Sequence, residues 1–413
     1  MSGELVFHAV CDLTALVRGR AVPLADYEAN PERGTGWVPA NQSITPFGPM
    51  ASQTPFDAVG DLRLRPDSAS RARAQLPGAT PLDLVLCDIS QADGSDWSCC
   101  ARTYCRDALA KLTRETGLAL VATFEHEFQV PDGAPWRPFS LAEMRRREPL
   151  LTLLADALAQ AGCEPENLLP EYGPGQFELT CKPASALAAA DRSVLARVLA
   201  GEVAHALGLP ITFAPLTSLE GVGNGVHVHL GLVDATGAPA GLGGPGMAFA
   251  AGVLARVRAL TALTAACPVS FLRLTPHRWS AATAALGRAN RETVLRIAGS
   301  GSGEHLEYRA ADATACPYLT IGGIVQAGLA GVREKLPLPP ILERDPATLS
   351  VAELASYTPL PSSLDEALAA LSDDPLGLPS LLLETYLGLK RGELELCAGL
   401  DDAARVARYA DVF

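Results

Sequence analysis

Carboxylates and imidazoles recur in four separate segments of this chain. They are Glu125 and Glu127 in VATFEHEFQV, Glu171 and Glu178 in PEYGPGQFELTCKP, His227 and His229 in NGVHVHLGL, and Glu307 in EHLEYRAAD. Crowded carboxylates repel one another unless cations lie between them, and oxygen-rich sites of this kind suit Mg²⁺ or Mn²⁺, with imidazole as a further ligand. The four segments together therefore predict a site for divalent cations.

Alternation of polar and apolar residues predicts that three of these segments are strands. In FEHEF, Glu125 and Glu127 are two residues apart and point the same way, while His126 points the opposite way. His227 and His229 share a face in VHVHL, and HLEYR repeats the pattern. An isolated Glu-x-Glu or His-x-His is also typical of a solvated strand face. Here the polar faces recur in strands otherwise built for burial, which favours a sheet that lines a polar funnel.

The composition excludes several classes of partner. The chain has 413 residues, of which 48% are hydrophobic and 19% charged, and its formal net charge is −13. This length and apolar content predict two or more domains with large cores. The acidic balance argues against nucleic acid or an anionic membrane as a partner.

Targeting and redox signals point to the cytoplasm. The N-terminal residues MSGELVFHAVCDLT lack a basic start and a long apolar run, so we expect no signal peptide. The most apolar stretch, Met247–Ala266, contains Arg256 and Arg258, which is typical of a buried or interface helix rather than a membrane span. The ten cysteines form no CxxC or zinc-like pattern, which predicts reduced thiols in a cytoplasmic protein.

The chain changes character near residue 105. Residues 1–105 combine short apolar runs with turns rich in Pro and Gly, which predicts a small, mostly β domain. Residues 106–413 contain longer segments with helical periodicity, and Leu336–Pro340 breaks the chain before a helical tail. The helices that we expect before that break are Leu141–Ala161, Ala184–Leu207, Pro245–Ala266, Ala281–Glu292 and Tyr318–Lys335. Because the polar strands lie between these helices, the predicted fold class is α+β.

The same segments, in this order, resemble the glutamine synthetase superfamily. The similarity covers residues from about 105 to 333 and, more loosely, the N-terminal part. It rests on NGVHVHLGL, on FLRLTPHRWSAATAALGRANRETVLRI, and on EYRAADATACPYL, which is similar to the family signature Glu-x-Arg-x-x-Asp-x-x-x-x-Pro-Tyr-Leu. Upstream, DLRLRPDSAS and LVLCDIS resemble the family's β-grasp domain.

This resemblance carries expectations about architecture and cofactors. It implies an N-terminal β-grasp domain at 1–105 and a catalytic domain at 106–413, in which an antiparallel sheet funnel is backed by helices. It implies ATP and two or more Mg²⁺ or Mn²⁺ ions in each active site. It also implies a ring-shaped homo-oligomer whose active sites lie between subunits.

The resemblance divides the cation ligands into two groups. The matches are Glu127, Glu171 and Glu178 for the first metal site, and Glu125, His227 and Glu307 for the second. Two divalent ions could hold the γ-phosphate of ATP and the substrate carboxylate, and stabilise charge during phosphoryl transfer.

Three arginines match positions that contact phosphate in the family. Arg291 and Arg296 match arginines that hold the ATP phosphates and the γ-glutamyl phosphate. Arg309 lies on the same strand face as Glu307, which suits it to the transferred phosphate.

Three further matches concern the acid substrate. Arg273 matches the arginine that binds the α-carboxylate of glutamate, a task for which the planar guanidinium is suited. His229 matches a histidine near the substrate and the phosphate. Gly223 matches a backbone position against the amino acid, where a side chain would obstruct approach.

Three departures from the family pattern concern the pocket for ammonium. Ammonia-using members carry a Glu six residues after the arginine that Arg273 matches, and here that position is Trp279. His305, which we expect beside the substrate, stands where the family has an arginine two residues before Glu307. The N-terminal loop Trp37–Ile44 lacks the Asp that deprotonates ammonium in those members. A Trp could stack on a cation or an alkyl amine, or merely fill space left by a shifted loop.

The residues for metal and phosphate are therefore complete, whereas those for ammonium are not. This contrast predicts an ATP-dependent ligase that activates glutamate or a close analogue as γ-glutamyl phosphate and condenses it with an organic amine. The γ-glutamylamide and γ-glutamylpolyamine synthetase branches of the family are similar. In such an enzyme Arg291, Arg309 and Trp279 would act at the reacting groups. Two alternatives stay open, namely an ordinary glutamine synthetase that uses ammonia and a non-catalytic paralogue that keeps the fold.

Overall fold

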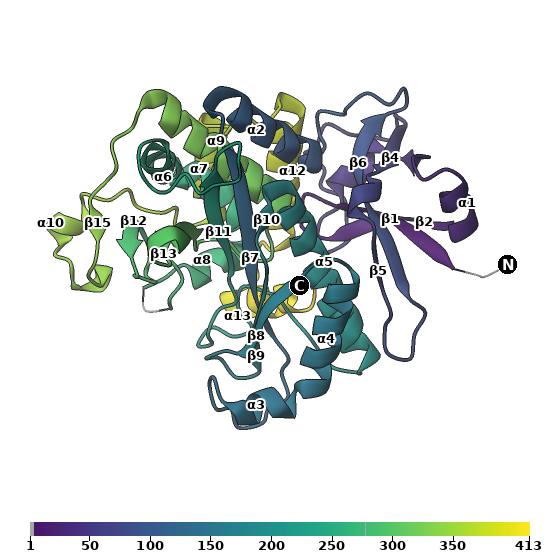
Figure 1. Ribbon diagram of the computed structural model, residues 1–413, viewed down its shortest axis with the longest axis horizontal. Coiled ribbons are helices and arrows are strands. Elements are labelled where there is room, and N and C mark those ends of the chain that lie inside the picture. The colour runs from purple at the N-terminus through teal and green to yellow at the C-terminus, as the bar shows by residue number, and fades with distance from the viewer. Residues whose placement is uncertain (1–3, 277) are drawn as a thin grey trace.

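The computed structural model describes residues 4–276 and 278–413 and contains two β-sheets (Figure 1). The N-terminal sheet has the strand order β2-β1-β6-β4-β3, with β5 paired to β6. Strands β1 and β6 run parallel, and the other neighbours are antiparallel. Its elements are β1 (Leu5–Cys11), β2 (Val17–Pro23), α1 (Leu24–Ala29), β3 (Thr35–Trp37), η1 (Pro39–Ser43), β4 (Leu62–Pro66), η2 (Ser68–Ser70), β5 (Ala72–Ala74) and β6 (Leu82–Gln91).

The second sheet has the strand order β15-β12-β13-β14-β11-β7-β9-β8, with β10 paired to β7. It is antiparallel from β13 to β8, and β12 runs parallel to both of its neighbours. Its strands are β7 (Ala119–Gln129), β8 (Pro165–Pro170), β9 (Gln176–Cys181), β10 (Ala184–Ser185), β11 (Val226–Val233), β12 (Thr283–Arg288), β13 (Thr293–Ala298), β14 (His305–Tyr308) and β15 (Ile341–Leu342). The predicted α+β class, with an antiparallel sheet in the catalytic part, is confirmed.

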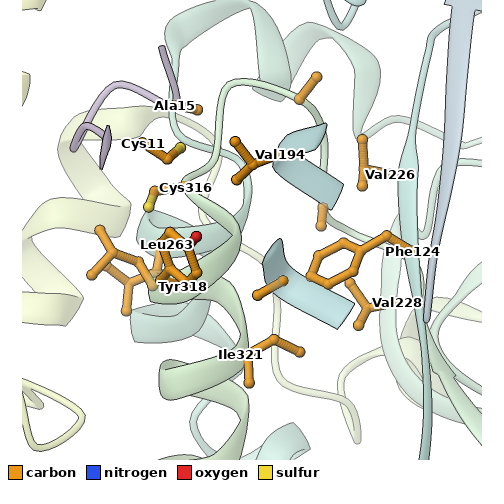
Figure 2. Packing of buried hydrophobic residues seen from close by; sticks show 14 of the residues in the cluster. Cys11, Ala15, Phe124, Val194, Val226, Val228, Leu263, Cys316, Tyr318 and Ile321 are labelled. Carbon is orange, nitrogen blue, oxygen red and sulfur yellow. The ribbon is translucent and has the colours of Figure 1, made fainter. Parts of the chain in front are cut away.

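Helices cover the apolar face of this second sheet. α9 packs against α2, α5, α6 and α7, while α5 and α2 also contact β7. Figure 2 shows Phe124 of β7 and Val228 of β11 directed toward Val194 of α5 and Ile321 of α9. The helices are α2 (Ala101–Thr116), α3 (Leu141–Arg146), α4 (Glu148–Gln160), α5 (Ala186–Ala206), α6 (Pro245–Ala255), α7 (Val257–Thr264), α8 (Pro268–Arg273), α9 (Pro317–Glu334), α10 (Val351–Leu354), α11 (Leu364–Asp373), α12 (Ser380–Leu396) and α13 (Asp402–Ala410), with short turns η3 (Gly301–Gly303) and η4 (Pro346–Thr348).

Two predicted helices are each divided in the structure. The helix expected over 141–161 is interrupted at Arg147, one residue before α4, whose second residue is Pro149. Proline cannot donate the hydrogen bond that would continue the preceding helix. The helix expected over 245–266 bends by 77° between α6 and α7. No proline lies at that break, and the two halves pack on different neighbours, α6 on α9 and α7 on α11 as well as α9.

The helix predicted over 281–292 is wrong. Residues 283–288 form strand β12, and Arg291 lies in the turn before β13. The sequence AATAALGR is rich in good helix formers. Sheet pairing on both sides overrides this local preference, because it gives the buried backbone of β12 its hydrogen-bond partners. In contrast, the helices predicted over 184–207 and 318–335 are confirmed as α5 and α9.

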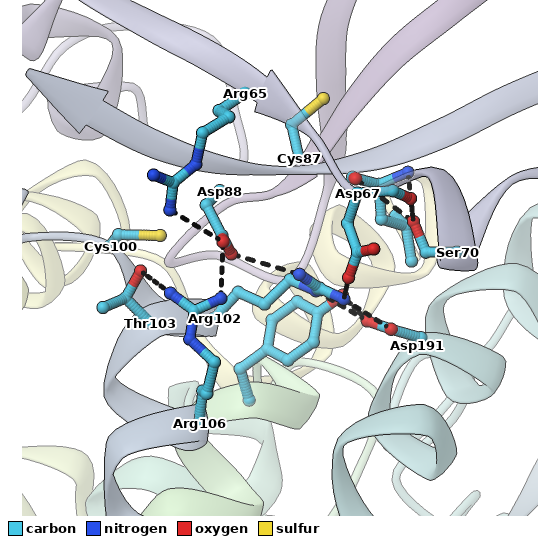
Figure 3. Close-up of polar contacts among 12 residues, drawn as sticks. Arg65, Asp67, Ser70, Cys87, Asp88, Cys100, Arg102, Thr103, Arg106 and Asp191 are labelled. Atoms are coloured by element: carbon cyan, nitrogen blue, oxygen red, sulfur yellow. Dashed lines mark hydrogen bonds and ion pairs between the residues drawn. The ribbon is translucent and has the colours of Figure 1, made fainter. Parts of the chain in front are cut away.

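An ionic cluster connects the N-terminal sheet to the helices of the second part (Figure 3). Arg102 of α2 donates two hydrogen bonds to Asp191 of α5, at 3.0 and 2.8 Å, one to Asp88 of β6 at 3.1 Å and one to Asp67 at 2.7 Å. Arg106 donates to the second oxygen of Asp88. α2 begins at Ala101 and packs along α9. We therefore propose that the second domain includes the whole of this helix, within which the predicted boundary at residue 105 falls.

The apolar segment 245–264 lies inside the protein. Most of its residues are buried, in both α6 and α7. Among the residues described, no single helix has the length and apolar character needed to cross a membrane, and α6 with α7 meets those criteria only as a pair with a 77° bend. The cysteines are buried free thiols.

Candidate active site

Strand register brings the predicted carboxylates and histidines together on one face of the second sheet. Glu125 of β7 is paired with His227 of β11, Glu127 with Glu178 of β9, and Glu307 of β14 with both His229 and Arg296. Residues paired across neighbouring strands project from the same face. His126 projects from the opposite face, as predicted, and its buried ring contacts the Ser193 hydroxyl at 2.9 Å. Long-range pairing therefore joins four segments that are far apart in the sequence.

Short contacts connect the histidines to Glu125. Its two carboxylate oxygens lie 2.6 Å from Nδ1 of His227 and 3.2 Å from Nε2 of His229. The other ring nitrogen of His229 lies 2.9 Å from Nε2 of His305. Gly225 donates its backbone N–H to Glu127 at 2.6 Å. The result is a continuous set of oxygen and nitrogen donors along the strands.

This donor set fits divalent cations. Two triads have donor atoms within 4.8 Å of one another, Glu125 with Glu127 and His227, and Glu125 with His229 and Glu307. Carboxylate and imidazole are ligands that Mg²⁺ and Mn²⁺ accept in proteins. The triads differ from the two groups expected from the family, because Glu171 and Glu178, at the β8–β9 side, form a hydrogen bond with each other instead.

Charge is poorly compensated on that β8–β9 side. Burial, followed by repulsion from Glu125, Glu127 and Glu171, raises the pKa of Glu178 to about 10. Burial and the charge of Glu127 also raise the pKa of Glu171. Glu178 therefore holds a proton at neutral pH unless a cation replaces it, and ionisation of Glu171 is disfavoured.

On the opposite side of the site, histidines and arginines compensate the negative charge of the carboxylates. Burial opposes ionisation of Glu125, yet hydrogen bonds from His227 and His229 hold its pKa well below the usual value. Burial likewise opposes ionisation of Glu307, and the charge of Arg309 leads the effects that lower its pKa. Burial also acts to lower the pKa of His229, but the hydrogen bond to Glu125 raises it above the ordinary value.

Arginines surround the carboxylates. Arg309 makes an ion pair with Glu307, which Arg296 also contacts at 2.7 Å. Arg273 is 2% exposed and donates to the carbonyl oxygens of Ala310 and Ala311, and its Nε has no hydrogen-bond partner. Burial lowers the pKa of both Arg273 and Arg296. Each predicted arginine, including the more exposed Arg291, lines the same cavity.

Two cavities meet at the carboxylates. The first, of about 570 Å³, is lined largely by apolar and small residues of β7, β11 and α6. The second, of about 550 Å³, is lined by Gly223, Arg273 and Trp279 together with the cation donors. Both cavities reach Glu125, Glu178, His229 and Arg296. The sheet face therefore forms the middle of a channel, where the two cavities meet, and we call this part the waist. This arrangement agrees with the predicted polar funnel.

His305 lines the first of the two cavities. The sequence predicts that it lies beside the substrate, and it belongs to the described lining of the first cavity and not to that of the second, where Arg273 lies. Its Nδ1 contacts the carbonyl oxygen of Gly303 at 2.8 Å. It stands at the start of β14, two residues before Glu307 and on the side of the first cavity.

Glycines at the second cavity are required by neighbouring side chains. A Cβ on Gly223 would lie 2.6 Å from Cγ of Arg273, and a Cβ on Gly225 would lie 2.8 Å from Nε2 of His227. Gly223 was expected to make room for a substrate, and in the structure it makes room for the arginine. Gly225 was not singled out, although it directly precedes VHVHL.

Sequence reasoning also missed several lining residues. Gln176 donates to the carbonyl oxygen of Gly223 at 2.9 Å and to Asn224 at 3.0 Å, so it orders the loop behind Arg273. The PGQFE segment beside Glu178 was the signal that could have identified it. Tyr172 and Phe139 line the cavity next to Trp279. No periodic pattern marks these two, because both lie in loops.

Known proteins of similar sequence share one family description. Residues 98–409 match the family described as "Glutamine synthetase, catalytic domain", and residues 2–97 match "Glutamine synthetase N-terminal domain". The gamma-glutamylpolyamine synthetase GlnA3 of Streptomyces coelicolor is 33% identical over 99% of this chain and 95% of its own. The gamma-glutamylethanolamide synthetase GlnA4 of the same organism is 30% identical over 81% of this chain and 76% of its own. A crystal structure described as a novel glutamine synthase homolog has a TM-score of 0.91 and 41% identity, covering 100% of this chain and 99% of that one.

Proposed function

The chain belongs to the glutamine synthetase family, and on that premise we propose that it makes γ-glutamylamides from glutamate, an organic amine and ATP. Enzymes of this family are ATP-dependent ligases that form C–N bonds and use divalent metals. The two similar synthetases named above make γ-glutamyl derivatives of amines. The observation that carries the choice of acceptor is Trp279, which lines the substrate cavity where ammonia-using members place a carboxylate.

We assign the cation donors to two ions that share the waist of the channel. The proposed ligands are Glu127, Glu171 and Glu178 for one ion, and Glu125, His227 and Glu307 for the other. Bound ions would neutralise phosphate charge and replace the proton held by Glu178. Whether the ions are Mg²⁺ or Mn²⁺ depends on their supply, because carboxylate and imidazole accept both.

The first cavity suits the nucleotide. Its apolar walls at β7, β11 and α6 could bury an adenine ring, and its inner end reaches Arg296 and His305. A triphosphate that entered by this route would have its γ-phosphate at the carboxylates. We therefore assign Arg296, Arg291 and Arg309 to phosphate oxygens and His305 to the nucleotide side.

The second cavity suits the acid substrate. Arg273 lines this cavity, and its buried guanidinium is fixed by two backbone carbonyls and by Asp312, 3.8 Å from its Nε, so the side of the guanidinium at the cavity could bind a carboxylate. We assign it to the α-carboxylate of glutamate, with Gly223 and His229 beside the substrate. A γ-carboxylate oxygen then attacks the γ-phosphorus of ATP, and ADP leaves with the electron pair of the broken P–O bond. The amine nitrogen next attacks the acyl carbon, phosphate leaves, and one amine proton is released with it.

The decisive experiment is a screen for ADP release by the wild-type enzyme with glutamate and ATP. We expect the best organic amine to exceed ammonium by roughly ten- to two-hundred-fold in kcat/KM, the range that an apolar contact of about 1–3 kcal/mol provides. Trp279→Glu should shift preference toward ammonium, because a carboxylate returns to the pocket. If wild type uses ammonium best, ordinary glutamine synthesis replaces this proposal.

A non-catalytic role is the less favoured alternative. A scaffold has no use for buried carboxyl groups that repel one another, yet Glu171 and Glu178 remain uncompensated by any described arginine partner. Calorimetry that detected no binding of ATP with Mg²⁺ would revive that alternative.

We also propose a ring-shaped homo-oligomer with active sites between subunits, as the family resemblance implies. Light scattering should give the mass of an assembly of several subunits, each of 43.2 kDa.

A further inference from the structure

We infer that Tyr172, Trp279 and Phe139 form an aromatic clamp at the mouth of the substrate cavity, and that this clamp selects primary monoamines with an apolar substituent over polyamines. The inference rests on the proposed function, because it specifies the acceptor of the same reaction. It differs from what the relative with 33% identity would suggest, since that protein is named for polyamines.

The three aromatic side chains are exposed where a ligand could cover them. Tyr172 is 48% exposed, Trp279 is 49% exposed and Phe139 is 58% exposed, and all three line the cavity that contains Arg273. The rings of Tyr172 and Trp279 meet edge to face, with centroids 5.1 Å apart and planes at 77°. Large aromatic surfaces left open beside a polar cavity favour binding of an apolar group, because covering them removes apolar area from water.

The backbone holds two of these rings in a costly conformation. Trp279 has φ of 52° and Phe139 has φ of 56°, in the left-handed region that bulky residues rarely adopt. Such a conformation is strained for a bulky residue and persists only where surrounding contacts enforce it. The surrounding contacts thus hold the side chains of Trp279 and Phe139 at the cavity in spite of this backbone strain.

Hydrogen bonds fix the loop that carries Trp279. Its backbone N–H donates to the carboxylate of Glu292 at 3.0 Å, and its carbonyl oxygen accepts from Arg309 at 2.9 Å. The neighbouring Arg278 donates to the carbonyl oxygen of Gly221 at 3.0 Å. Because Arg309 also contacts Glu307, the position of the Trp ring is coupled to the waist of the channel.

Tyr172 is likewise tied to the reacting end. Its N–H donates to the carboxylate of Glu171 at 2.8 Å, so the ring begins one residue from a proposed cation ligand. An amine that attacked an acyl group at the waist would therefore extend its substituent over the exposed surface of the joined rings of Tyr172 and Trp279. Aromatic faces can also attract the ammonium form as it arrives.

The charges around the mouth disfavour a second ammonium group. The carboxylates in the described lining are Glu125, Glu127, Glu171 and Glu178, and all of them are assigned to cations at the waist. Farther out, the charged lining side chains are arginines, Arg278 and Arg291. The carboxylate of Glu292 is held at the backbone N–H of Trp279 and is not in the described lining of the cavity. A distal ammonium at the rings would thus meet mainly like charge and apolar surface, whereas a methyl group would meet favourable surface.

Butylamine and 1,4-diaminobutane test this inference as a matched pair. Both have four carbons, and butylamine ends in a methyl group where the diamine ends in an aminomethyl group. Steady-state ADP release with saturating glutamate and ATP·Mg²⁺ should give butylamine a kcat/KM at least about tenfold higher. Equal or better use of the diamine by wild type would overturn the clamp.

Three variants connect that preference to the rings. Tyr172→Ala and Trp279→Ala should each lower kcat/KM for butylamine by roughly ten- to two-hundred-fold, chiefly through KM, and narrow the difference from the diamine. Tyr172→Phe keeps the ring and should retain the preference, which separates contact from misfolding. Val351→Ala, at a side chain 86% exposed on α10 outside both cavities, is the control and should match wild type.

Different results would contradict the proposed ligase activity and the proposed clamp. Absence of ADP release with every amine and with ammonium would contradict the proposed ligase itself. Release with amines, combined with an unchanged butylamine preference in Tyr172→Ala and Trp279→Ala, would overturn only the clamp.

Discussion

The protein has a cluster of carboxylates in each of two places, and the two clusters differ in whether arginines compensate their negative charge. At the junction of the two domains, Asp67, Asp88 and Asp191 surround Arg102, so fixed cations neutralise the acids. In the channel, Glu171 and Glu178 lie together without such a partner among the described contacts, and the pKa of Glu178 rises to about 10 through burial and repulsion. The first group is typical of a structural ion-pair cluster, and the second is typical of a cation-binding site.

The pKa directions express the same difference. At the junction, burial opposes ionisation of Asp88, but Arg106 and Arg102 lower its pKa below the usual value. In the channel no described arginine does this for Glu178. Acid that is compensated inside the fold stabilises it, whereas acid that is left uncompensated costs stability until a ligand binds.

Removal of a carboxylate from the channel should have the largest effect, and on turnover rather than on folding. Glu127→Ala should lower kcat by roughly 10³-fold or more, since loss of a metal ligand removes several kcal/mol of transition-state stabilisation. The metal-free variant should unfold at the same or a higher temperature than wild type, because repulsion is relieved. Thermal unfolding with EDTA and with Mg²⁺, beside ADP release, measures both.

Glu307→Ala sharpens this test within the same site. It should also abolish turnover, but it leaves Arg309 and Arg296 without their shared partner and should destabilise the metal-free protein. Full activity in either variant would contradict the assignment of two metals.

Removal of the central cation at the junction should act on stability alone. Arg102 is 4% exposed, and Arg102→Met would leave three carboxylates without their common partner. We expect a loss of about 3–5 kcal/mol in the free energy of unfolding, equal with and without Mg²⁺. Urea titrations in both buffers measure it, and a loss that Mg²⁺ restored would remove the distinction between the two clusters.

Arg65→Ala provides the control for that variant. Arg65 contacts Asp96 at 2.8 Å and Asp88 at 3.5 Å, but its side chain is 40% exposed. Exposed ion pairs contribute up to about 1 kcal/mol, so this loss should be small and should shrink further in high salt.

The last prediction concerns the pH dependence of stability without metal. The folded pKa of Glu178, about 10, lies above its ordinary value of 4.5, so its contribution to stability is fully present below pH 4.5 and is lost as pH rises toward 10. Asp88 has a lowered pKa, so its contribution is present at neutral pH and lost as pH falls through the folded value.

The melting temperature in EDTA should therefore decrease from about pH 6 to about pH 9, because both values lie between the unfolded and the folded pKa of Glu178. Glu178→Gln imitates the protonated form and should flatten that decline, and saturating Mg²⁺ should flatten it in wild type. A decline of unchanged slope in Glu178→Gln would show that another group is responsible.

Much of the channel could be predicted because its signals are local. A strand places alternate residues on one face, so FEHEF and VHVHL indicated which side chains would project together before any pairing was known. Helices with continuous periodicity and a terminal glycine, such as α5 before Gly208, were also predictable.

The rest depended on pairing between distant segments. β12 was predicted as a helix because its alanines favour one locally, and only its neighbours in the sheet make it a strand. Register also decides that His305 lies on the side of the first cavity, which the sequence alone does not indicate. No local pattern marks Tyr172 or Phe139, because loop residues have no period.

The sequence by itself determined the chemical character of each strand face, since alternation requires nothing beyond the neighbouring residues. Only the tertiary structure decided which carboxylates have arginine partners and which do not. Arg102 reaches Asp88 and Asp191 from different elements, and Glu127 lies opposite Glu178 through strand register. Compensation of charge acts through space over a few ångströms, so it is set by the folded arrangement rather than by distance along the chain.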